Sequence, residues 1–191
     1  MVDYARFLPL SNRPRDDESA VTSDRRLATA AVIDEAARLT AAAGSERADR
    51  LAADFVRDAR LGTEIGSEFV VADLMDLASA VRTGKRRRTS ALVHATRAVI
   101  VLADRLGEAP RLADLTLGAV ALYMATSAPL ERRAVVAGHA IRATDADWEF
   151  GRGPVLEGPQ LEIVRFLLGL SDLAPGPARG EARPTADGKA G

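Results

Sequence analysis

Nucleophilic or metal chemistry in this chain would usually need histidine, because the sequence has no cysteine. The chain has two histidines, His94 and His139. Without cysteine there is no disulfide, thiolate ligand or thiol nucleophile. Ser90 and Ala98 lie one turn before and after His94, so a second metal ligand is missing there. A histidine on an apolar helix is more often a hydrogen-bonded core residue than a ligand. His94 is still the candidate catalytic base and the candidate metal ligand.

A second candidate site is built around the single tryptophan, Trp148, with Arg142 and Arg152 near it in the chain. An indole flanked by two guanidinium groups is suited to form one wall of a ligand-binding site. The alternative is that Trp148 anchors a hairpin on the helices. The pair Asp145 and Asp147 is interpreted as a turn, because aspartate side chains there bond to nearby backbone amides.

The basic run at 85–88, Lys-Arg-Arg-Arg, is the third candidate, since such a run can bind phosphate. No aromatic residues are interleaved with it, and like-charge runs usually lie in solvent. The net charge of -1 and the pI near 6.2 give no overall attraction to nucleic acid. Nucleic acid is therefore the least favoured partner.

Five helices are predicted in the first two thirds of the chain, from the helical spacing of apolar residues and from glycines that end the helices. They span 23–43, 45–61, 68–82, 90–106 and 113–126. The helix at 90–106 is apolar nearly all round, which predicts a central position. Residues 133–144 favour an extended segment. Trp148–Phe150 and Val155–Glu157 are expected to be short strands joined by the Gly-Arg-Gly-Pro turn at 151–154. A last apolar helix is expected from Pro159.

The fold class expected is mainly α, a helical bundle of four to five helices with a small C-terminal α+β appendage of an antiparallel hairpin plus a helix. The expected divisions are a flexible leader at 1–22, the bundle at 23–130, the appendage at 131–173 and a disordered tail at 174–191. No signal peptide or membrane span is expected, and the absence of cysteine fits a reducing interior, so a cytoplasmic location is predicted.

Residues 141–170 resemble the C-terminal segment of the actinobacterial mycothiol-dependent maleylpyruvate isomerase family, whose helical part belongs to the DinB-like superfamily. The residues that carry the resemblance are Ala143, Thr144, Asp145, Asp147, Trp148, Gly151, Gly153, Pro154, Gly158, Pro159 and the leucine-rich helix after them. Upstream, His94 and then Leu106 and Gly107 follow in the order of that family.

The resemblance implies a helical bundle that holds zinc, with mycothiol as the thiol cofactor, acting on small acids or transferring thiols. The family's glutamate before its second histidine falls on Ser90 here, and the first histidine falls on Leu77. His94 is then the one ligand of three that remains, which describes a degraded metal site, because a single imidazole holds a metal weakly.

Two functions of different classes remain open from the sequence. The first is a divergent member of this family that binds a small molecule or a thiol cofactor, with its status as an enzyme undecided. The second is a non-catalytic helical interaction protein that associates with itself or with a partner. A nucleic-acid-binding regulator that uses residues 85–88 ranks third.

Overall fold

The computed structural model describes residues 23–43, 45–61 and 73–178. The helices in these ranges are α1 (Arg26–Ala41), α2 (Ser45–Asp58), α3 (Asp73–Thr83), α4 (Thr89–Leu106), α5 (Asp114–Ser127), α6 (Leu130–Val136) and α7 (Gln160–Leu167). The strands are β1 (Ala140–Ala143), β2 (Glu149–Gly151), β3 (Val155–Gly158) and β4 (Gly176–Pro177). The expected class, mainly α with a small α+β appendage, is confirmed.

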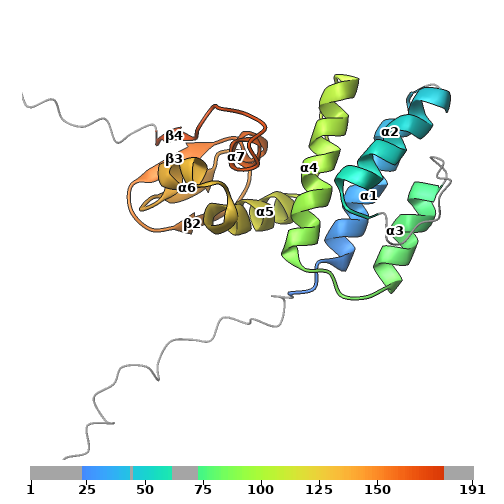
Figure 1. Ribbon diagram of the computed structural model, residues 1–191. Helices are drawn as coiled ribbons and strands as arrows, with labels where there is room; N and C mark the ends of the chain where they lie inside the picture. Colours follow the sequence, from blue (N-terminus) through green and yellow to red (C-terminus); the bar gives the residue numbers. More distant parts are fainter. Residues whose placement is uncertain (1–22, 44, 62–72, 179–191) are drawn as a thin grey trace, which may run out of the picture.

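The first four helices form a bundle on one side of the molecule (Figure 1). α1 packs against α2, α3 and α4, while α4 also contacts α2 and α5. The predicted central position of α4 is confirmed by these contacts and by its many buried side chains, among them Leu92, Val99 and Ile100. α4 ends at Gly107, whose φ of 69° is the left-handed conformation that glycine adopts readily.

α5 connects the bundle to the C-terminal part, because it packs against α4 on one side and against α6 and α7 on the other (Figure 1). The linker before α5 is tied to the bundle by Glu35, a buried residue of α1 whose Oε1 accepts the Arg111 amide over 2.7 Å. Asp104 of α4 and Arg165 of α7 form a second connection, with N–O distances of 2.9 and 2.5 Å. The C-terminal part is therefore tied to the bundle by contacts on both sides of α5 as well as through α5 itself.

The expectation of an extended segment over 133–144 was wrong for residues 133–136, which belong to α6. The β-branched pair Val135 and Val136 suggested a strand. Pro129 starts the helix instead, and its carbonyl accepts the amides of Arg132 and Arg133. Val136 is buried while Val135 is exposed, so the helix turns one of the two valines inward. The extended part of the prediction holds for β1.

The sheet has the order β2-β1-β3-β4. The sequence predicted a hairpin of β2 and β3, but β1 lies between these two strands. β2 pairs antiparallel with β1, so the hairpin is formed by these two strands, and β3 pairs parallel with β1 on its other side. The connection at 152–154 therefore crosses the start of β1. Gly153, at φ 114°, makes this crossing possible, because a Cβ there would lie 2.1 Å from the Gly138 carbonyl oxygen.

The ordered chain continues past the expected boundary at 173, because β4 pairs antiparallel with β3 through Gly176 and Pro177. The leader at 1–22, the start of the third predicted helix and the tail from 179 lie outside the described residues. Every helix in the described ranges is too short or too polar to traverse a lipid bilayer.

Candidate functional site

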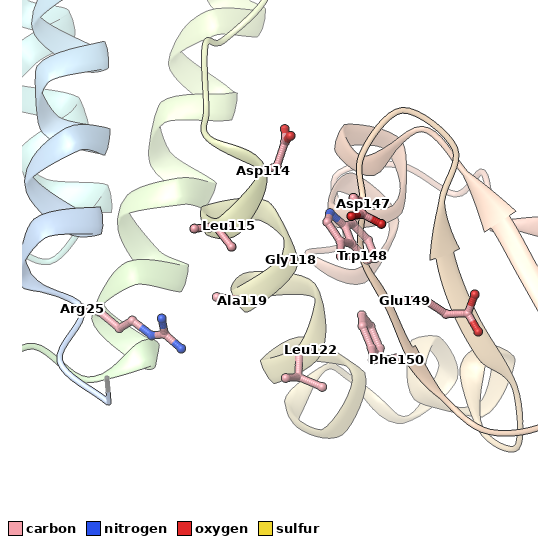
Figure 2. Close-up of a pocket in the computed structure, with 10 residues that line it drawn as sticks. All are labelled: Arg25, Asp114, Leu115, Gly118, Ala119, Leu122, Asp147, Trp148, Glu149 and Phe150. Atoms are coloured by element: carbon pink, nitrogen blue, oxygen red, sulfur yellow. The ribbon is translucent and has the colours of Figure 1, made fainter. Parts of the chain in front are cut away.

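A groove of about 550 Å³ lies between α5 and β2, with the residue just before α1 at one end (Figure 2). Its volume is in the range of small-molecule sites. The residues that line it are Arg25, Asp114, Leu115, Gly118, Ala119, Leu122, Asp147, Trp148, Glu149 and Phe150.

The α5 side of the groove is apolar and uncovered. Leu115, Ala119 and Leu122 are spaced at i, i+4 and i+7, so they share one face of the helix. Leu115 is 88% exposed and Leu122 is 55% exposed. The opposite faces of α5 bury residues such as Leu117 and Val120. A helix that is apolar all round therefore leaves one apolar face open to solvent.

The part of the groove lining beside β2 is aromatic. Trp148 directly precedes β2 and Phe150 lies within it, so the two side chains, two residues apart, lie on the same side of this extended segment. The rings are stacked, with centroids 5.7 Å apart and an interplanar angle of 15°. Gly118 lets the indole approach the α5 backbone, because a Cβ at this position would lie 3.2 Å from Trp148 Cδ1.

Gln160, the first residue of α7, fixes the orientation of the indole. The Trp148 Nε1 donates a hydrogen bond to Gln160 Oε1 over 3.2 Å, and Gln160 Nε2 donates to Asp114 Oδ1 over 2.6 Å. The backbone amide of Gln160 donates to Asp145 Oδ1 over 2.7 Å. This last bond agrees with the interpretation of Asp145 as a residue that binds nearby backbone amides.

The charges of the groove are separated along its length. Figure 2 shows Asp114 and Asp147 near Trp148, Arg25 at the far end beside α1, and Glu149 pointing away from α5. Glu149 lies 3.8 Å from Arg142. Asp147 is exposed and forms no ion pair with any residue that the structure describes. The end beside the indole is therefore acidic.

The three ligand-binding residues predicted from the sequence do not come together in one site. Trp148 lines the groove. Arg142, on β1, forms an ion pair of 2.8 Å with Glu157 on the neighbouring strand β3. Arg152 is exposed in the connection that crosses β1. Neither arginine is among the residues that line the groove.

His94 is half-buried on α4, away from the groove lining. Its pKa is lowered, first by burial and then by the positive charges of Arg60 and Arg97. Within the described ranges, no three His, Asp or Glu side chains are close enough together to hold a metal ion. These surroundings do not fit zinc, because two guanidinium groups repel a divalent cation and the described residues supply no carboxylate or imidazole co-ligands there.

The basic run at 85–88 takes part in holding the start of α1. Arg86 donates to Ser23 Oγ over 2.8 Å, and the Arg87 amide donates to Asp24 Oδ1 over 3.1 Å. Burial opposes ionisation of Asp24, but hydrogen bonds from the Arg87 and Arg26 amides and the Arg26 side chain outweigh it and lower its pKa. The run is therefore at least partly occupied within the chain itself.

No protein-family model, no curated protein and no solved structure matches this chain. Membership of the maleylpyruvate isomerase family stays a prediction from residues 141–170.

Most of the residues that line the groove were not predicted from the sequence as site residues, among them Arg25, Asp114, Leu115, Gly118 and Leu122. One signal was present, because Gly118 is an isolated glycine inside an otherwise regular helical pattern. Such a glycine often marks a close approach, which here is that of the Trp148 ring.

Proposed function

We propose that this protein binds a small organic molecule with an apolar body and a cationic group, and that the groove between α5 and β2 is the binding site. The observation that carries the proposal is the pairing of an uncovered leucine face with a fixed aromatic wall, next to an acidic end. The proposed role is binding; no catalytic step is assigned to these residues.

The apolar body of the ligand is expected between the two walls. Leu115 and Leu122 are exposed on α5, and Trp148, directly before β2, lines the same groove. Covering a leucine side chain completely is worth about 1.5–3 kcal/mol, so two leucines supply a useful share of a micromolar affinity.

The cationic group is expected beside Asp147. Asp114 lies close by but already accepts the Gln160 amide, whereas Asp147 forms no ion pair within the described residues. An ammonium group near the indole also gains from the electron-rich ring face. Arg25, at the opposite end, has one guanidinium that does not balance the two carboxylates near Trp148.

The aromatic wall is organised before any ligand arrives. Trp148 is held by its hydrogen bond to Gln160 and by its contact with Gly118. Because the ring does not have to be ordered on binding, less of the interaction energy is lost.

The proposal is tested by calorimetry with three probes that share a phenylpropyl body and differ in the head group: 4-phenylbutylamine, 4-phenylbutanol and 4-phenylbutyrate. We expect the amine to bind most tightly, the alcohol more weakly and the acid most weakly. Asp147→Asn should remove most of the advantage of the amine over the alcohol. Asp76→Asn, the same charge change at an exposed carboxylate on α3, should leave it intact. Equal affinities would contradict the role of the acidic end, and no binding of any probe would reject the proposal.

Self-association, the second function that the sequence leaves open, is the competing use of the same leucines. Sedimentation velocity of the full chain and of Leu115→Ser separates the two. A monomer in both cases agrees with a small-molecule site. A dimer that Leu115→Ser abolishes would make the groove an interface and would reject the small-molecule proposal.

A further inference from the structure

We propose that residues Tyr4–Leu10 of the same chain occupy the groove in the absence of another ligand, so that the protein carries its own competitor. The inference uses the groove of the proposed function but does not require the proposed ligand. It rests on where the described chain begins, on the apolar face left uncovered there, and on the chemistry of the preceding segment.

The described chain begins at the groove. Ser23 and Asp24 are fixed by Arg86 and Arg87 over 2.8 and 3.1 Å, and the next residue, Arg25, lines the groove. Figure 2 shows Arg25 projecting from the start of α1 on the side that faces α5. Whatever precedes Ser23 is therefore attached next to the open leucine face.

The chain before Ser23 is long enough for Tyr4–Leu10 to reach the groove. Twelve residues, 11–22, separate Leu10 from Ser23. At roughly 3.3–3.6 Å per residue, this spacer reaches at most about 40 Å, more than enough to turn back along one helix of 14 residues. A short tether also gives an effective concentration of about the millimolar range, so even weak contacts would occupy the groove.

The chemistry of the segment matches that of the groove. Tyr4, Phe7, Leu8 and Leu10 lie within seven residues, and Arg6 lies among them. The spacer that follows contains no aromatic residue and no leucine. The segment thus offers an apolar cluster with a cation, which is the combination that suits Leu115, Leu122 and the carboxylate of Asp147.

Occupancy by this segment would lower the apparent affinity of any other ligand by the fraction of molecules whose groove is open. Weakening the segment should therefore increase the affinity for a groove ligand, whereas weakening the groove should reduce it. The two kinds of variant are expected to act in opposite directions.

The absence of cysteine makes a direct test simple. Ala5→Cys places one nitroxide label in the full chain, and amide NMR signals report which residues lie near it. The expected result is selective broadening of Leu115, Ala119 and Leu122, with Met75 on α3 unaffected. Combined Phe7→Ser and Leu8→Ser should restore the signals, whereas the control Asp17→Ser in the spacer should not.

Mixing labelled chain with isotope-enriched unlabelled chain identifies the source of the segment. Broadening that appears only within one molecule supports the proposal. Broadening between molecules would show that a second copy supplies the segment, and uniform or absent broadening would show that the segment does not dock. Both of these results would overturn the proposal.

The outcome is separable from that of the proposed function. Selective broadening together with no binding of 4-phenylbutylamine, even by the Phe7→Ser and Leu8→Ser variant, would reject the ligand but keep the docked segment. Binding of the amine with no selective broadening would keep the ligand and reject the docked segment.

Discussion

Trp148 and Gln160 are joined by a hydrogen bond of 3.2 Å from the indole Nε1 to the side-chain amide Oε1. Gln160 Nε2 in turn donates a hydrogen bond of 2.6 Å to Asp114 Oδ1. Only 9% of Gln160 is exposed. The three residues come from the strand side, from α7 and from α5, so this short chain of bonds fixes the distance between the two walls of the groove.

Replacing Gln160 with Met should therefore loosen the site as well as the fold. The change leaves the half-buried indole N–H without its partner, and about 1–3 kcal/mol of the free energy of unfolding should be lost. A double-mutant cycle with Trp148→Phe, measured by urea denaturation with circular dichroism, isolates the bond. Additive effects of the two substitutions would show that the bond contributes nothing.

Gly153→Ala should be far more damaging than Gly107→Ala, although both glycines have positive φ. At Gly107 no atom lies within 4 Å of the new Cβ, so the cost is about 1 kcal/mol of backbone strain. At Gly153 the Cβ would lie 2.1 Å from the Gly138 carbonyl oxygen, which forces the crossing connection to move. We expect a loss of about 3 kcal/mol or more in thermal or urea unfolding. Similar losses for both variants would contradict the crossing.

Glu35 predicts a pH dependence of stability. Burial raises its pKa, but hydrogen bonds from Arg38 and the Arg111 amide outweigh burial, so the pKa in the folded state lies below the unfolded value of about 4.5. A lowered carboxyl pKa stabilises the fold above the unfolded pKa, and the contribution is lost as pH falls through the folded pKa.

The measurement is the free energy of unfolding of the wild type and of Glu35→Gln between pH 3 and 7. The wild type should be more stable by about 2 kcal/mol near pH 7, and the difference should shrink steadily below pH 4.5. A difference that stays constant down to pH 3 would mean that the carboxylate charge is irrelevant.

Replacing Thr96 or Thr40 with valine should change the free energy of unfolding in opposite directions. Both are fully buried, but Thr96 Oγ1 has no hydrogen-bond partner in the described structure, whereas Thr40 Oγ1 donates to the Ala36 carbonyl over 2.9 Å. Thr96→Val should raise the free energy of unfolding by about 1 kcal/mol, and Thr40→Val should lower it by about the same amount. A loss in both variants would indicate that Thr96 bonds to a buried water.

The helices were largely predictable because their signals are local. Gly107 ends α4 where the sequence indicated, and the even apolar coverage of α4 gave its central position. The start of α6 was missed because the valines at 135 and 136 suggested a strand, while the stronger local signal was Pro129 at the first turn.

The sheet and the groove depend on contacts between distant residues, which local patterns do not contain. The two short strands around 151–154 were predicted, but not that they pair with β1 on opposite sides, which depends on how their connection packs over Gly138. The helix at 113–126 was also recognised. That its Leu115 and Leu122 remain uncovered follows from where α4, α6 and α7 sit, and the helix is too evenly apolar to indicate this itself.

The central claim is that the groove beside Trp148 binds an apolar cation, and the single tryptophan of the chain allows this to be measured directly. Intrinsic fluorescence should be recorded while the full chain is titrated with 4-phenylbutylamine. If the amine binds in the groove, we expect a saturable change in the Trp148 emission that 4-phenylbutyrate does not reproduce and that Asp147→Asn weakens. If calorimetry detects binding of the amine but the Trp148 emission stays unchanged, the ligand binds elsewhere and the groove is not the site.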